Sequence, residues 1–113
     1  MLTREELPPC PVATTLLLIG NKWKIFILQR LLERTWRFNE LQKDIPGISQ
    51  RVLTDNLRAM EQDGIVKRKV YAEIPPKVEY SLSELGETMR PIIKSMHNWG
   101  IEYQNLVNNS DSK

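Results

Sequence analysis

Hydrophobic and polar positions in residues 48–64 follow the period of an amphipathic helix. Ser49 is a favourable N-cap for this helix, and Gly64 can adopt the left-handed backbone that ends it. At about 100° per residue, the apolar positions fall on one face: Leu53, Leu57 and Met60. The sequence therefore predicts a helix with one buried and one exposed face.

The start and the polar face of this helix carry the candidate binding residues: Ser49, Gln50, Arg51, Thr54, Asp55 and Arg58. Guanidinium and carboxamide groups suit the base edges and the phosphates of a DNA major groove. The alternative interpretation is a solvated helix face stabilised by i,i+4 charge pairs. The neighbouring segments favour the DNA-binding interpretation.

Two further helices are predicted before this one. The first begins with Cys10 as its N-cap and Pro11 at its first position, where proline loses no hydrogen bond, and it ends before Gly20. Residues 22–32 are apolar almost all round, which is typical of a central buried helix. Residues 1–9 are expected to form an extended lead-in.

The segment before the amphipathic helix predicts a helix-turn-helix unit. After a short strand over residues 36–38, Asn39 is expected to cap a short helix over residues 40–45. Pro46 and Gly47 then form a tight turn. A short helix, a glycine-containing turn and a longer helix with a polar outer face make up this DNA-binding unit.

Two β-prone runs follow the helix, over residues 65–71 and 78–82, and they predict a hairpin. A basic hairpin beside a recognition helix is the wing of a winged helix, which touches phosphates or the neighbouring minor groove. The alternative is a solvated edge strand that its charge protects from aggregation. The candidate wing contacts are Lys67, Lys69 and Lys77.

Ser83 is expected to cap a last helical region, in which Pro91 must kink or restart the helix. Its apolar stripe continues for more than about 20 residues, or roughly 30 Å, which is longer than the small core can cover. The surplus face predicts a homodimer. The expected dimer contacts are Val12, Leu16, Met89, Ile93, Met96, Trp99 and Tyr103. Residues 108–113 are expected to be a disordered tail.

The composition narrows the functional class. The 113 residues suffice for one domain, and the net charge of +2 is too mild to indicate nucleic acid by itself. No basic-then-apolar leader and no membrane-length apolar run is present, so a soluble cytoplasmic protein without a membrane partner is expected. His97 is the only histidine and its neighbours are apolar, so neither an enzyme, a metal site nor a cofactor is predicted.

Several motifs, in order, resemble the HxlR-type, MarR-like winged helix-turn-helix transcriptional regulators of bacteria. They are CPV, LLLIGNKW, RFNEL, IPGISQRVLT, NLRAMEQDGIV and YAEIPPKVEYSLSELG, and they cover about residues 10–100. The resemblance implies a mainly α domain, over residues 10–107, with a small hairpin wing. It also implies a homodimer, joined through the first and last helices, that binds a roughly palindromic DNA operator, most simply as a repressor.

Part of that family resembles thiol-based sensors of electrophiles and oxidants, and Cys10 occupies the matching position. Independently, the positive end of a helix dipole favours a thiolate at an N-cap. The alternatives are that Cys10 is only a small cap residue and that the regulator is constitutive or gated by a small ligand. A winged helix that binds protein instead of DNA is the remaining alternative.

Overall fold

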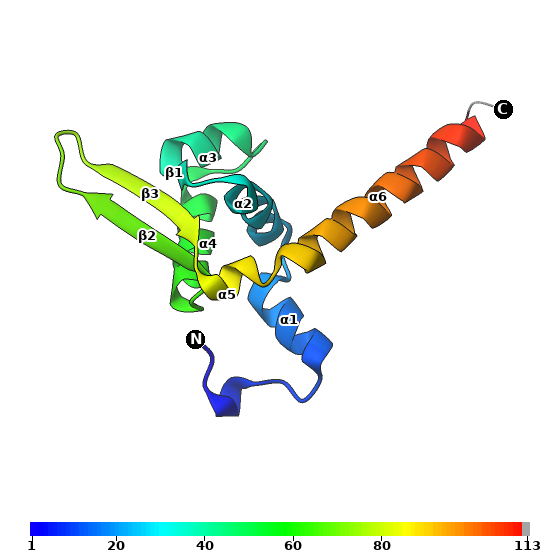
Figure 1. Cartoon of the computed structure of the whole chain (residues 1–113), viewed down its shortest axis with the longest axis horizontal. Coiled ribbons are helices and arrows are strands. Elements are labelled where there is room, and N and C mark those ends of the chain that lie inside the picture. Colours follow the sequence, from blue (N-terminus) through cyan, green and yellow to red (C-terminus); the bar gives the residue numbers. More distant parts are fainter. Residues whose placement is uncertain (112–113) are drawn as a thin grey trace.

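The computed structural model describes residues 1–111 of the chain. Figure 1 shows a small body from which a hairpin and a long helix project on opposite sides. In chain order the elements are η1 (Arg4–Glu6), α1 (Pro11–Ile19), α2 (Lys22–Glu33), β1 (Trp36–Arg37), α3 (Phe38–Asp44), α4 (Gln50–Gln62), β2 (Val66–Tyr71), β3 (Lys77–Leu82), α5 (Glu84–Glu87) and α6 (Arg90–Asp111).

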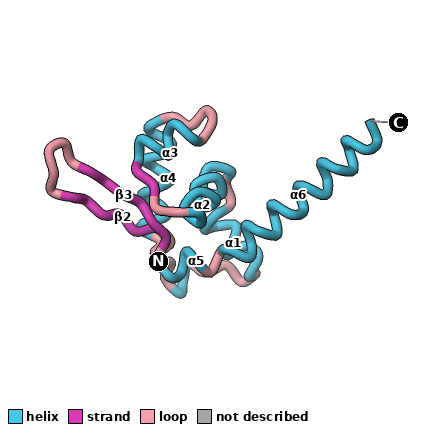
Figure 2. The backbone as a smooth tube through the Cα atoms, turned by 45° about the horizontal axis from the view of Figure 1, so that its top comes forward, coloured by secondary structure: helices cyan, strands magenta, loops and turns pink. Residues whose placement is uncertain are grey.

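The core lies where α2, α3 and α4 meet the base of the sheet, as the tube in Figure 2 shows. The central position predicted for α2 is confirmed, because Ile27, Leu28 and Leu31 are buried. The Trp36 indole Nε1 donates a hydrogen bond to the Arg30 carbonyl oxygen at 2.8 Å, so β1 is held against α2. Burial of these side chains is the main force that fixes the body.

The sheet is antiparallel with the order β1-β3-β2, and it confirms the predicted hairpin. Val66 pairs with Leu82 at its base and Tyr71 with Lys77 near its tip. β1 adds a short third strand, because Trp36 pairs with Tyr80. The fold is therefore mainly helical with a small sheet that carries a wing, as the sequence predicted.

The start of α3 differs from the prediction. Its N-cap is Arg37 and not Asn39, so the helix begins earlier than expected. The reason is that the Glu40 carboxylate accepts a hydrogen bond from the Arg37 backbone N–H at 2.8 Å, which satisfies a donor at the helix start. The same bond lowers the pKa of Glu40.

Two terminal predictions also need correction. The lead-in over residues 1–9 is not wholly extended, because η1 forms a single turn in which the Thr3 N–H donates to the Glu6 carboxylate. At the other end, α6 continues through Asp111, so residues 108–111 are helical where a disordered tail was expected. Neither proline nor glycine interrupts the helix there. The last two positions of that predicted tail lie outside the described residues.

The predicted cap at Ser83 and the predicted break at Pro91 are both confirmed. Ser83 Oγ accepts a hydrogen bond from the Gly86 N–H at 3.0 Å, and its hydroxyl lies within hydrogen-bond distance of the Gly64 and Ile65 carbonyl oxygens. α5 ends at Glu87 and α6 restarts at Arg90. Ser83 thus joins the last helical region to the end of α4 and the start of the hairpin.

Replacing Ser83 with alanine should lower the free energy of unfolding by about 1–2 kcal/mol, since it removes both a cap and a partly buried hydroxyl contact. Urea denaturation followed by circular dichroism measures this change. Ser83→Thr, which keeps both hydrogen-bonding functions, is the matched control and should retain most of the stability. Equal losses in the two variants would contradict the assigned role of the hydroxyl.

Within residues 1–111, no single helix is long and apolar enough to cross a membrane. In the described part of the chain, one bent pair of helices, α1 and α2, reaches that length and composition when taken together, and the two helices meet at 81°.

Candidate nucleic-acid interface

Caps and a buried face hold α4 in place. Ser49 Oγ accepts a hydrogen bond from the Val52 N–H at 3.1 Å, which confirms the predicted N-cap. Gly47 before the helix and Gly64 after it have φ values of 77° and 78°, a conformation that favours glycine. The predicted apolar face is fully buried at Leu53, Leu57 and Met60. The helix therefore presents a fixed outer face.

That outer face carries polar groups with few internal partners. The Arg51 side chain is 93% exposed, and within residues 1–111 its only ion pair is with Asp55 at 4.0 Å. A pair of this kind contributes about 0–1 kcal/mol, so Arg51 can leave it readily for another ligand. Gln50 and Arg58 are also exposed, whereas Thr54 is half-buried and donates its hydroxyl hydrogen to the Gln50 carbonyl oxygen. Two guanidinium groups and an amide thus point outward from one rigid helix.

Two polar contacts brace the helix-turn-helix unit against α2. The Asn21 side-chain amide donates to Asn56 Oδ1 at 3.1 Å and links α2 to α4. Arg30 Nε lies 2.7 Å from Asp44 Oδ2 and links α2 to α3. These contacts therefore tie both helices of the unit to α2.

The three predicted wing lysines do not have equal freedom. Lys67 and Lys69 are exposed on β2 and share one face, because successive strand residues alternate. Lys77 is half-buried, and its Nζ lies 2.8 Å from Glu79 Oε1 and 4.6 Å from the centre of the Tyr71 ring. The bond with Glu79 raises the pKa of Lys77 and lowers that of Glu79. Lys77, which was predicted as a wing contact, is thus engaged within the wing itself.

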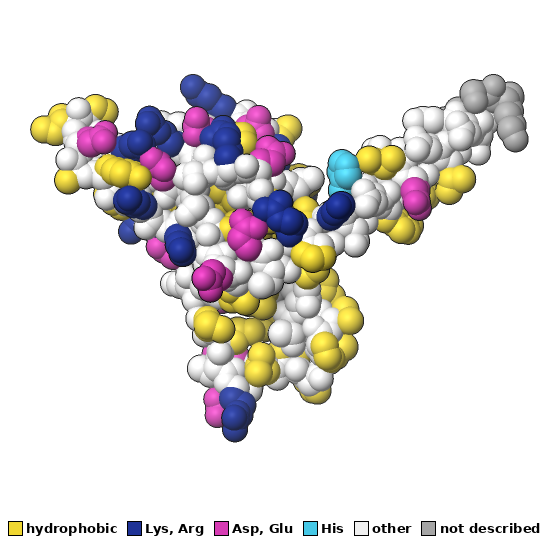
Figure 3. Space-filling model, in the orientation of Figure 1, with side chains coloured by type: hydrophobic (Ala, Val, Ile, Leu, Met, Phe, Trp, Pro, Cys, Tyr) yellow, Lys and Arg dark blue, Asp and Glu magenta, His cyan; other side chains and the backbone are white. Residues whose placement is uncertain are grey.

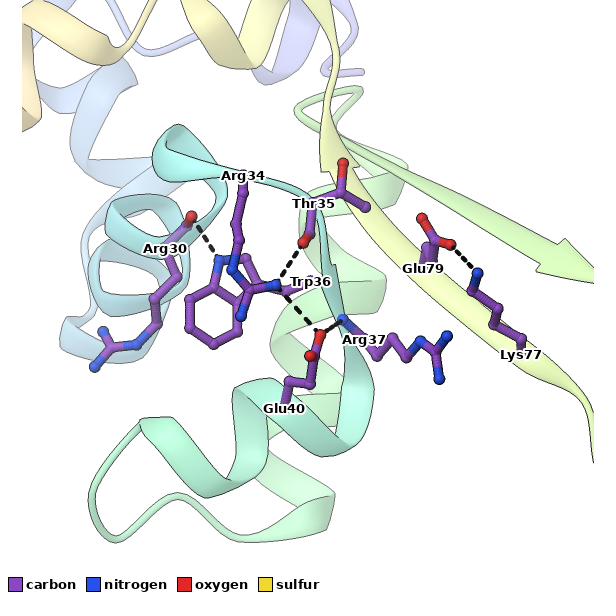
Figure 4. Close-up of polar contacts among 8 residues, drawn as sticks. All are labelled: Arg30, Arg34, Thr35, Trp36, Arg37, Glu40, Lys77 and Glu79. Carbon is purple, nitrogen blue, oxygen red and sulfur yellow. Dashed lines mark hydrogen bonds and ion pairs between the residues drawn. The ribbon is translucent and has the colours of Figure 1, made fainter.

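Sequence reasoning missed Arg37, which lies at the junction of β1 and α3. Its side chain extends toward Lys77 and Glu79 (Figure 4), yet none of the ion pairs within residues 1–111 involves it. The neighbouring Arg34 is engaged instead, with its guanidinium stacked 3.6 Å from the Trp36 ring centre. The available signal was the alternation of apolar Trp36 with basic Arg37 in a predicted short strand.

Cys10 is the exposed N-cap of α1, as predicted. Its thiol makes no cap hydrogen bond, while its carbonyl oxygen accepts one from the Thr14 hydroxyl at 3.3 Å. The thiol is therefore open to solvent and to small reagents in the protomer. Within the described part of the chain, no group of three or more His, Cys, Asp or Glu side chains could hold a metal ion.

A second exposed surface is apolar and runs along α1 and α6, where Figure 3 shows hydrophobic side chains on both elements. Trp99 is 67% exposed and stacks on Tyr103 with ring centroids 5.6 Å apart. A tryptophan is expected in the core by default, but Trp99 is not a core residue. We call the exposed set the α1/α6 apolar face, and its members are Val12, Leu16, Ile92, Met96, Trp99, Tyr103 and Leu106.

Met89 and Ile93, which the sequence analysis assigned to the dimer contact, do not belong to this face. Both are buried in the protomer's own core, with 8% and 6% of their surface exposed. The apolar stripe of the last helical region therefore serves two purposes. Its first part covers the core, and its later part is left uncovered.

Residues 18–108 match the model of the HxlR-like helix-turn-helix family. The chain is 48% identical over 103 residues to the HTH-type transcriptional regulator YdeP of Bacillus subtilis, covering 91% of this chain and 80% of YdeP. The redox regulator HypR in its reduced form superposes with a TM-score of 0.83 at 45% identity, over 88% of this chain and 99% of HypR. The oxidised form of HypR superposes with a TM-score of 0.79 at 49% identity, over 82% of this chain and 96% of HypR. Diamide-treated YodB from B. subtilis superposes with a TM-score of 0.69 at 35% identity, over 83% of this chain and 94% of YodB.

Proposed function

The chain belongs to the HxlR-like helix-turn-helix family of transcriptional regulators, and from this premise we propose that it represses a gene as a homodimer bound to a roughly palindromic operator. The family comprises DNA-binding regulators and not enzymes. The observation that carries the proposal is the outer face of α4, where Arg51 and Arg58 are exposed on a helix whose other face is buried. The exposed Lys67 and Lys69 on the adjoining wing supply contacts to phosphates. Because its target is chromosomal DNA, we infer that the protein acts in the cytoplasm.

The α1/α6 apolar face supports the dimeric part of the proposal. Its aromatic members Trp99 and Tyr103 are large, and burying them against a second copy removes a wide apolar area from water. A two-fold axis through this face repeats α4 once in each half of the dimer. The two copies of α4 then address two half-sites about one helical turn apart, which accounts for a palindromic operator.

We further propose that Cys10 makes the regulator sensitive to oxidants or electrophiles. The thiol is exposed, and α1 contributes to the α1/α6 apolar face, so a change at Cys10 is well placed to alter how the subunits pack. The similarity to HypR, a redox regulator with an oxidised and a reduced form, favours this reading. The chain has a single cysteine. Diamide would therefore oxidise two thiols to a disulfide, either the Cys10 thiols of two subunits or one Cys10 thiol and a small thiol, and would itself take up the two hydrogen atoms.

The proposed function is tested by titrating the protein into labelled DNA from its own upstream intergenic region and into random DNA of equal length. Fluorescence anisotropy is recorded over a series of salt concentrations, first reduced and then after diamide. Specific binding that weakens steeply with salt supports an operator-binding regulator, since salt opposes counterion release. Equal affinity for both DNAs with little salt dependence would contradict it and favour the protein-binding alternative.

Cys10→Ser should bind the operator as tightly as the wild type but lose any response to diamide, because serine preserves the cap position and cannot form a disulfide. The same anisotropy titration measures this effect, and dithiothreitol should restore binding of the oxidised wild type. A variant that still releases DNA after diamide would refute the role of Cys10. If the wild type itself ignores oxidants, a ligand in the groove of about 330 Å³ between α2 and α6, beside Arg90 and His97, becomes the better hypothesis.

A further inference from the structure

The short helix α5 lies at the junction between the end of α4 and the start of α6, the long helix of the α1/α6 apolar face (Figure 1). Its N-terminal end is bonded to the segment that joins α4 to β2, because the Ser83 N–H donates to the Ile65 carbonyl oxygen at 3.0 Å. Its C-terminal end leads directly into α6, because the Met89 N–H donates to the Gly86 carbonyl oxygen at 3.1 Å. The angle between α6 and α4 therefore depends on how α5 is seated.

Gly86 is the buried residue of α5, and it lies where a larger residue does not fit. A Cβ atom at this position would lie 3.1 Å from the Leu82 side chain and still closer to the Ile65 carbonyl oxygen. Because carbon–oxygen contacts need about 3.3 Å, a methyl group at residue 86 would push the two backbones apart by on the order of 1 Å. Ile65 is held in place, since its side chain is fully buried and its N–H donates to the Met60 carbonyl oxygen at 2.9 Å. The absence of a side chain at Gly86 thus sets the distance between α5 and the end of α4.

Arg90, the first residue of α6, forms a second attachment at this junction. Its Nη2 donates to the Leu32 carbonyl oxygen of α2 at 3.1 Å and to the Glu87 carboxylate of α5 at 2.8 Å. α6 is therefore anchored at its first residue to two other helices. Beside this anchor, a cavity of about 340 Å³ lies among the end of α2, β3 and α5. Because α5 is not closely packed against α2 there, a shift of α5 does not have to displace the core.

We propose that Gly86 and Arg90 are positioning residues that set the spacing between the two half-sites of the operator. The inference rests on the proposed function, in which a homodimer joined through the α1/α6 apolar face places one copy of α4 in each half-site. Since α6 belongs to the interface and α4 to the DNA, the angle held at α5 determines how far apart the two copies of α4 lie. The two-fold axis doubles any change in this angle, and one base pair adds only about 3.4 Å along the DNA.

Operators with base pairs inserted or deleted between the half-sites test this proposal. Fluorescence anisotropy gives the affinity at each spacing, and the wild type should bind one spacing best. For Gly86→Ala, the ratio of affinity at that spacing to affinity at the best neighbouring spacing should fall at least about fivefold, because the two copies of α4 move relative to each other. A loss of stability alone would weaken binding at every spacing by the same factor and leave the ratio unchanged.

Gly100→Ala is the matched control for this substitution. Gly100 lies within α6, and a Cβ atom there would have no neighbour within 4 Å among the described residues outside its own stretch of helix. The variant adds the same methyl group to the same chain without crowding the junction. It should therefore keep the ratio of affinities that the wild type shows.

Arg90→Ala tests the second attachment with little risk to folding, since 53% of the Arg90 side chain is exposed. Without its bonds to α2 and α5, α6 can pivot at the junction, so the preference for one spacing should broaden. The same ratio of affinities should fall about threefold. Lys94→Ala removes an equal charge from an exposed position one turn further along α6, and it should keep the ratio of the wild type.

The outcomes separate this inference from the proposed function. If the wild type binds its operator specifically but has no preferred spacing, or if each variant matches its control, this inference alone is wrong. If the wild type does not distinguish the operator from random DNA at any spacing, the proposed function is wrong as well. Circular dichroism and sedimentation velocity identify a variant that no longer folds or dimerises. If Gly86→Ala is such a variant, the comparison of Arg90→Ala with Lys94→Ala decides.

Discussion

Trp99→Glu should convert the proposed dimer to monomers, raising the dissociation constant by at least about a thousandfold. The substitution places a carboxylate at the most exposed aromatic position of the α1/α6 apolar face. Because a two-fold interface contains each residue twice, a loss of about 2 kcal/mol at each copy is counted twice. Sedimentation velocity at several protein concentrations measures the change directly.

The consequences of this substitution for DNA binding follow from symmetry. A monomer places a single copy of α4 on one half-site, so the affinity for the full operator should collapse while weak binding to random DNA persists. Ile101→Glu is the matched control, since Ile101 is exposed on the same helix but lies outside the α1/α6 apolar face. A Trp99→Glu protein that remains dimeric, or an Ile101→Glu protein that dissociates equally, would place the interface elsewhere.

Local sequence signals were sufficient for α4 and for the wing. Ser49 and Gly64 mark the ends of α4 by chemistry that acts within a few residues, and Leu53 and Leu57 repeat at the helical period. The hairpin was equally visible, because two β-prone runs flank a loop with two prolines, and its pairing begins at Val66. The fold class and the exposed polar face of α4 could therefore be predicted.

The remaining features depend on particular side-chain contacts that periodicity and capping preference do not specify. Arg37 became the cap of α3 because Trp36 is tied to the Arg30 carbonyl oxygen and Glu40 reaches back to the Arg37 N–H. Lys77 was predicted as a wing contact, and Glu79, two residues further along β3, forms an ion pair with it. Ile93 and Trp99 looked equivalent in the apolar stripe, yet only Ile93 faces the core. The helical repeat of apolar residues identifies an apolar face, but it does not show what covers that face.

Arg51→Ala should lower the affinity for the operator by about 2–6 kcal/mol, because a guanidinium that reads a base contributes about 1–3 kcal/mol at each of two half-sites. Its effect on random DNA should be much smaller. The structure favours a large effect, since Arg51 is 93% exposed and loses only a loose contact with Asp55. Anisotropy titrations with the operator and with base-substituted operators measure both affinity and preference.

Lys69→Ala gives the contrast that makes this test specific. Lys69 is an exposed cation on β2, and removing it should weaken binding to every sequence alike while lowering the salt dependence. Arg51→Ala should instead relax the preference at one base pair in each half-site and leave the others intact. If Arg51→Ala reduces binding to operator and random DNA by the same factor, Arg51 contacts phosphate. Base readout would then fall to the other exposed groups of α4, Gln50 and Arg58.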